Sequence, residues 1–141
     1  MSKFRHTLGV IIGTISASIF IFLLEYANMK LFYPLPQGYT MDDMHDQARA
    51  TEVLSKMPAG AFVSILIIYA ITSMIGGIIA SIISGKMRSW PAIITGVLLG
   101  GMGLWDNMML KAPTWYTISA VIVSILFAFI GFQAVKKKTI D

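Results

Sequence analysis

The chain lacks cysteine altogether and is poor in charged residues, which make up 13% of its 141 residues. Without cysteine there are no disulfides, no thiol redox chemistry, no iron–sulfur cluster and no cysteine-ligated zinc. The two histidines, His6 and His45, fall on opposite sides of the membrane in the topology below, which argues against a bis-histidine haem. We therefore expect neither a metal nor a cofactor.

What the chain does contain is apolar. Hydrophobic residues make up 56% of it, and its mean hydropathy is +0.74; such values are typical of membrane proteins and not of soluble domains of this size. The net charge is +4, but the basic residues lie scattered between apolar blocks and form no aromatic-interleaved face. We expect a lipid bilayer as the surroundings and no nucleic acid as a partner.

Four stretches are long enough to cross a bilayer, whose core takes about 20 helical residues. They predict spans near residues 7–31, 59–84, 90–110 and 113–135, within one transmembrane domain over residues 1–141. Pro58, Pro91 and Pro113 each fall at the start of a span, where the missing N–H costs nothing. A cleaved signal peptide is the alternative for the first stretch, but no A-x-A-like site follows it. The predicted fold is an all-α integral membrane four-helix bundle.

The distribution of basic residues predicts the orientation of the spans. Seven lie on one side of the membrane, namely Lys3, Arg5, Lys86, Arg88, Lys136, Lys137 and Lys138. Four lie on the other side, namely Lys30, Arg49, Lys56 and Lys111. The positive-inside rule then makes both termini cytoplasmic and puts the loop 32–58 outside. We expect a multi-pass protein of the bacterial cytoplasmic (inner) membrane.

The outer loop is expected to carry one short extracytoplasmic helix. Thr40 begins the segment "TMDDMHDQARA", and Asp43 stands at the capping-box position behind it. Met41, Met44 and Ala48 share one face of a helix over about residues 41–50. Such a helix would lie on the membrane surface or cap the bundle.

Small residues form rows along three of the spans. Within a bilayer, helices associate by close backbone approach, which small side chains permit. The glycines that form these rows are Gly9, Gly13, Gly76, Gly77, Gly96, Gly100 and Gly103. We expect them to hold the helices together, and the rows are also compatible with a homo-oligomer.

Polar side chains gather near the outer ends of the first and third spans. Glu25 and Asp106 both sit near a helix C-terminus, where the macrodipole disfavours a carboxylate by about 0.3–1 kcal/mol. Either they snorkel to the interface beside lysines, or they share a pocket that binds a cation, a proton or a polar headgroup. The candidate pocket residues are Glu25, Asn28, Asp106, Asn107, Lys111 and Trp115.

Several short motifs make the chain similar to a known family. Glu25 is followed by "FYPLPQG", "MPAGAF" opens the second span, "GG" lies within it, and Asn107 and "PTW" come before the fourth span. In these features the chain resembles a family of small bacterial four-helix integral membrane proteins of uncharacterised function. Ala112 stands where a histidine commonly precedes the proline in that family. The resemblance implies the fold and the membrane location, and it implies no activity.

The sequence bears on three classes of function: an enzyme, a binding or structural protein, and a transporter. No Ser/His/Asp arrangement, phosphate loop or metal-ligand spacing is present, so we expect no catalytic residues and no enzyme. A non-enzymatic binding or structural role through the outer polar residues needs only the bundle and its outer loop. The alternative is a minimal proton- or cation-coupled small-molecule transporter acting as an oligomer, but Glu25 lies nearer the outer end than the midplane position expected for such a carboxylate. The ligand itself is not identified by the sequence.

Overall fold

The computed structural model describes residues 2–32, 38–39, 42–43, 46–85, 88–109 and 112–140. Over these residues the chain is helical. Its elements are α1 (Ser2–Leu31), α2 (Gln47–Lys56), α3 (Ala59–Ser84), α4 (Trp90–Met109) and α5 (Thr114–Ile140). The four long helices correspond to the four predicted spans, and each is long and apolar enough to cross a membrane.

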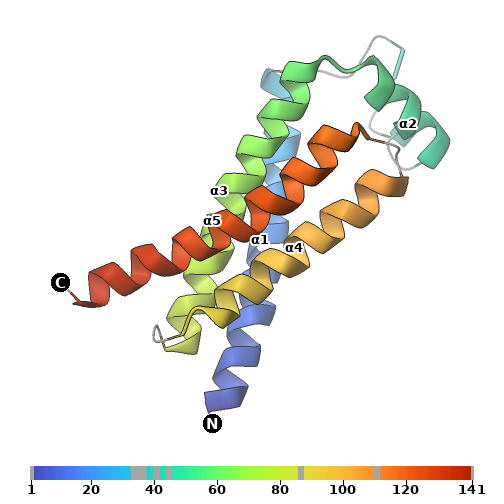
Figure 1. Ribbon diagram of the computed structural model, residues 1–141. Helices are drawn as coiled ribbons and strands as arrows, with labels where there is room; N and C mark the ends of the chain where they lie inside the picture. The colour runs from blue at the N-terminus through green and yellow to red at the C-terminus, as the bar shows by residue number, and fades with distance from the viewer. Residues whose placement is uncertain are drawn as a thin grey trace.

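The long helices form two crossing pairs (Figure 1). α1 lies along α3, and α4 lies along α5, while α3 also packs against α5. Successive long helices run in opposite directions, so the bundle has two distinct ends. We call these the α2 end, where α2 lies, and the terminal end, where the N-terminus, the end of α3 and the start of α4 lie.

The α1–α3 contact is built from small residues. A β-carbon on Gly9 would lie 2.7 Å from the carbonyl oxygen of Ala80, and one on Gly13 would lie 2.7 Å from that of Gly76. Gly76 in turn faces both α1 and α4, because its β-carbon would lie 3.0 Å from Ala17 Cβ and 3.3 Å from Thr95 Cγ2. Three helices therefore meet at Gly76, which we call the crossing point.

The contacts of α5 with α3 and α4 follow the same principle. A β-carbon on Gly77 would overlap the Ala128 carbonyl oxygen, and one on Gly131 would overlap that of Met74. One on Gly96 would lie 2.9 Å from Ala128 Cβ. Gly131 was not among the glycines singled out from the sequence. Its role comes from the packing of α5 against α3, where Gly131 faces the backbone of Met74 and Ile78, and this brings a fourth span into the glycine contacts.

Gly103 is an exception among the predicted packing glycines. A β-carbon there would meet no atom within 4 Å, whereas one on Gly100 would lie 3.4 Å from Val121 Cα. The spacing between α4 and α5 thus widens from Gly96 through Gly100 towards the α2 end. Gly103 therefore makes no close helix contact among the described residues, and its packing role stays a prediction.

The short helix α2 begins later than the sequence predicts. We expected it over about 41–50, but it runs over Gln47–Lys56; Thr40, Met41, Met44 and His45 lie outside the described residues. The local reason is the side chain of Asp46, whose Oδ1 accepts the backbone N–H of Ala48 at 3.1 Å and so caps the helix. Gln47 Nε2 donates to the Met109 carbonyl oxygen at 2.9 Å, which ties α2 to the end of α4.

Candidate functional site

One ionisable side chain from each long helix comes to the same level of the bundle. These are Glu25 on α1, Tyr69 on α3, Asp106 on α4 and Tyr116 on α5, which we call the polar layer. Ala17 on α1, Gly76 on α3 and Thr95 on α4 mark the crossing point. At ~1.5 Å per helical residue, Glu25 lies about 12 Å further along α1, Tyr69 about 10 Å away along α3 and Asp106 about 16 Å further along α4. The layer therefore lies between the crossing point and the α2 end.

Tyr69 is the central member of the polar layer. Its hydroxyl lies in hydrogen-bonding range of both the Glu25 carboxyl and the Tyr116 hydroxyl. A tyrosine has a single O–H, so when it donates to an ionised Glu25 its oxygen remains free to accept from Tyr116. The three side chains then form a row of hydroxyl and carboxyl groups from α1 across α3 to α5.

Asp106 supplies the second carboxyl of the layer. It is close enough to Glu25 and Tyr69 to interact electrostatically with both. Its side chain is exposed on α4, while Glu25 is partly buried. Within the described part of the chain, neither carboxylate forms an ion pair; the ion pair found there joins Arg49 and Asp43 at 3.2 Å. Two carboxyl groups, one on α1 and one on α4, therefore lie close enough to interact.

Asn28 lies one turn beyond Glu25 on α1 and is buried, with 8% of its surface exposed. Its side-chain oxygen accepts the Ser64 hydroxyl at 2.7 Å. This bond joins α1 to α3 beside the polar layer. Asn28 thus holds the two helices that carry Glu25 and Tyr69, and no contact between its side chain and the carboxylates is observed among the described residues.

Asn107 and Trp115 are the remaining candidate residues that the structure describes, and of these Trp115 contacts a member of the polar layer, since its ring lies edge-on to that of Tyr116 with centroids 6.2 Å apart. Asn107 turns to the buried side of α4; its side-chain nitrogen has no partner among the described residues, and its backbone oxygen accepts the Ala112 N–H at 2.9 Å. Trp115 packs edge-on against Phe62, with ring centroids 6.2 Å apart. Lys111 lies outside the described residues.

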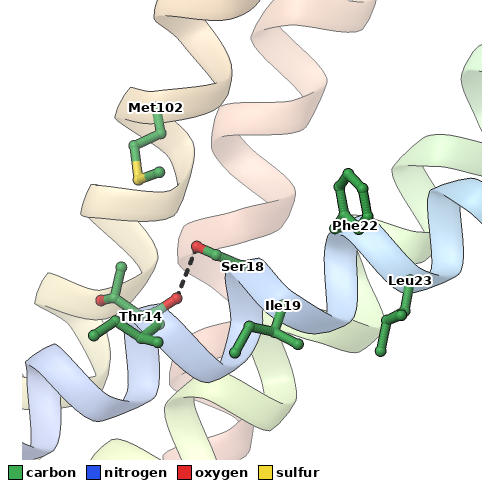
Figure 2. A pocket seen from close by; sticks show the side chains of 7 residues that line it. Thr14, Ser18, Ile19, Phe22, Leu23 and Met102 are labelled. Atoms are coloured by element: carbon green, nitrogen blue, oxygen red, sulfur yellow. Dashed lines mark hydrogen bonds between the residues drawn. The ribbon is translucent and has the colours of Figure 1, made fainter. Parts of the chain in front are cut away.

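A groove lies between α1 and α4, and Figure 2 shows side chains that line it. Its volume is about 440 Å³, and its wall is almost wholly apolar. The residues that line it are Thr14, Ile15, Ser18, Ile19, Phe22, Leu23 and Met102. Thr14 and Ser18, which the helical periodicity aligns with Glu25, thus face α4 across this groove.

Neither Tyr69 nor Tyr116 was among the candidate pocket residues predicted from the sequence. The available signal for Tyr69 was its phenol within the stretch "SILIIYAITS", inside a run of uncharged residues. A buried phenol in a membrane span needs a hydrogen-bond partner, and Glu25 at a similar depth is such a partner.

The described residues contain no group of three His, Asp or Glu side chains arranged to hold a metal ion. Comparisons of the chain with models of protein families, with curated proteins and with solved structures found no match. The function of the protein is therefore inferred from the geometry of the polar layer.

Proposed function

We propose that this protein is a non-enzymatic integral membrane protein whose polar layer binds a cation or a cationic group. The observation that carries the proposal is the pair of carboxylates, Glu25 and Asp106, which interact with each other and form no ion pair with a described base. In this proposal the α2 end faces the outside of a bacterial cytoplasmic membrane and both termini are cytoplasmic.

The chemistry of the layer favours a cation over other ligands. Carboxylates held away from bulk water are stable only when they are paired, hydrogen-bonded or protonated. A cation between Glu25 and Asp106 would relieve their mutual repulsion and compensate for their lost hydration. The Tyr69 and Tyr116 rings add electron-rich faces that attract organic cations in particular. An alkylammonium group combines both requirements.

The packing on the other side of the crossing point supports binding rather than transport. There, Gly9 approaches the Ala80 backbone and Gly131 approaches the backbone nitrogen of Ile78, so that no side chain separates these helices. A route from the polar layer to the terminal end would require such contacts to open. A transporter acting as an oligomer is the second candidate, and it would have to form its route between copies of the chain.

Binding of tetramethylammonium to the protein in phosphatidylcholine nanodiscs tests the proposal. Equilibrium dialysis should detect binding above that of empty nanodiscs, and Glu25→Gln should weaken it by about tenfold or more, because one of the two charges that attract the cation is removed. Asp106→Asn, on an exposed side chain, should weaken it as well. The control is Glu52→Gln on α2, where the carboxylate accepts the Tyr39 hydroxyl at 3.0 Å. Equal binding by all four proteins would refute the proposal.

Lys111 provides a further check, since it follows α4 directly and is a base. If an external cation fills the layer, Lys111→Gln should leave the tetramethylammonium affinity unchanged or slightly raised through weaker long-range repulsion. A gain as large as the loss caused by Glu25→Gln would mean that the lysine itself occupies the site. That result would make the layer an internal ion pair and contradict the proposed function.

A further inference from the structure

We infer that the cation bound by the polar layer is the head of a single-chain amphiphile, whose chain lies in the groove between α1 and α4. The inference rests on the proposed function and adds the class of ligand to it. Its basis is the continuity between the apolar groove and the two carboxylates.

The groove and the carboxylates lie on the same faces of their helices. On α1, Ser18, Phe22 and Glu25 follow one another at spacings of four and three residues, which places them along one side of the helix. On α4, Asp106 follows Met102 by four residues. Met102 lines the groove opposite Ser18 and Phe22 (Figure 2). A ligand that lies along the groove therefore reaches Glu25 on one wall and Asp106 on the other.

A second hollow supports the role of Asp106. It has a volume of about 550 Å³ on the far side of Met102 and is lined by Val97, Leu98, Gly101, Met102, Trp105 and Asp106. A β-carbon on Gly101 would meet no atom within 4 Å, so this side of α4 is open. Met102, a flexible side chain, separates the two hollows and is the element that can adjust to chains of different shape.

The dimensions of the groove suit one chain from one leaflet. From Thr14 to Glu25, α1 advances about 16 Å at ~1.5 Å per residue, which is close to half of the ~30 Å hydrocarbon core. The volume lies within the range of about 300–1,000 Å³ seen for small-molecule sites. A chain in this position would start at the carboxylates and end near the crossing point.

Thr14, which lines the groove near the crossing point, has a buried hydroxyl without a partner among the described residues. Most hydroxyls in the helices donate to the carbonyl oxygen four residues earlier, as Ser18, Thr72 and Thr95 do at 2.8–2.9 Å. The Thr14 hydroxyl is buried and makes no such bond, and the same is true of Ser73, which lies in the core.

Three probes separate the parts of the inference. They are dodecyltrimethylammonium, which has a chain and a cation, tetramethylammonium, which has only the cation, and dodecanoate, which has a chain and an anion. In nanodiscs, with binding by empty nanodiscs subtracted, the first should bind at least about tenfold more tightly than either of the others. Glu25→Gln should weaken the binding of both cations.

A bulky substitution in the groove provides the sharper test. Ile19 lines the groove and is 55% exposed, while Ile67 is 57% exposed on α3 and does not line it. Ile19→Trp should remove the affinity advantage of dodecyltrimethylammonium and leave tetramethylammonium binding unchanged, whereas Ile67→Trp should alter neither. Both side chains are exposed, so neither substitution should prevent folding, which circular dichroism would verify.

Each contrary result has a distinct meaning. If tetramethylammonium binds but the alkyl chain adds nothing, or Ile19→Trp has no effect, the chain does not lie in the groove and only this inference fails. Equal binding of dodecanoate would show that the charge of the head is not recognised and would also overturn it. A dimer in native mass spectrometry that Ile19→Trp dissociates would assign the groove to a second copy of the chain. If neither cation binds in a way that depends on Glu25, the proposed function itself fails.

Discussion

The most direct test of the fold is the substitution of alanine for glycine at three depths of contact. At Gly77 the added β-carbon would overlap the Ala128 backbone, at Gly100 it would lie 3.4 Å from Val121 Cα, and at Gly101 it would meet nothing within 4 Å. The three glycines lie in helices, so each variant gains the same helix propensity, up to about 1 kcal/mol. Differences between the variants therefore report the packing term alone.

The expected magnitudes follow from these contacts. At Gly77 the atoms in the way belong to the backbone of α5 and cannot move aside as a side chain can, so overpacking should destabilise the protein by about 1–3 kcal/mol. Gly101→Ala should be neutral or stabilising by up to about 1 kcal/mol, and Gly100→Ala should fall between the two. Unfolding by sodium dodecyl sulfate in dodecyl maltoside micelles, followed by circular dichroism, gives the free energies of unfolding.

The order of the three variants is the decisive result. If Gly77→Ala is as stable as Gly101→Ala, the close approach of α3 and α5 does not exist in the folded protein, and the arrangement of the bundle described above is wrong. If Gly101→Ala is strongly destabilised, the open side of α4 is occupied, as it would be in a tight oligomer. Size-exclusion chromatography of the wild type and the variants distinguishes this case from a simple loss of folding.

Two further predictions concern topology and the link between α1 and α3. Since the chain has no cysteine, single cysteines at Ser2, Gln47 and Thr139 can be labelled with an impermeant maleimide in intact cells, and only the cysteine at 47 should react; labelling at 2 or 139 but not at 47 would reverse the orientation. Ser64→Ala should lower the free energy of unfolding by about 1 kcal/mol through loss of the bond to Asn28, and it should cost nothing further in an Asn28→Ala background; additive losses in that double-mutant cycle would mean that the two side chains do not interact.

The polar layer shows which features of the site can be predicted from the sequence and which depend on the tertiary structure. From the sequence, Glu25 and Asp106 could be placed near the same end of two helices, because apolar length and charge are local properties. Whether they met across a gap or snorkelled separately depended on which faces the helices turned toward each other. Helical periodicity gives the face that a residue shares with others on its own helix, but it does not say which helix lies opposite. Tyr69 and Tyr116 belong to the polar layer because of the way the helices face one another in the tertiary structure.

The sequence by itself therefore determined the four membrane-length helices, since about 20 apolar residues can satisfy their backbone in a bilayer only as a helix. It also located most of the glycines at which backbones approach, because small residues four apart form a continuous row. Only the tertiary structure decided that Gly131 takes part and that a groove lies between α1 and α4. Gly96 and Gly100 approach α5, whereas Gly101 and Gly103 meet no neighbouring atom within 4 Å; which side of α4 is covered depends on the angles between the helices, which arise from all their contacts together.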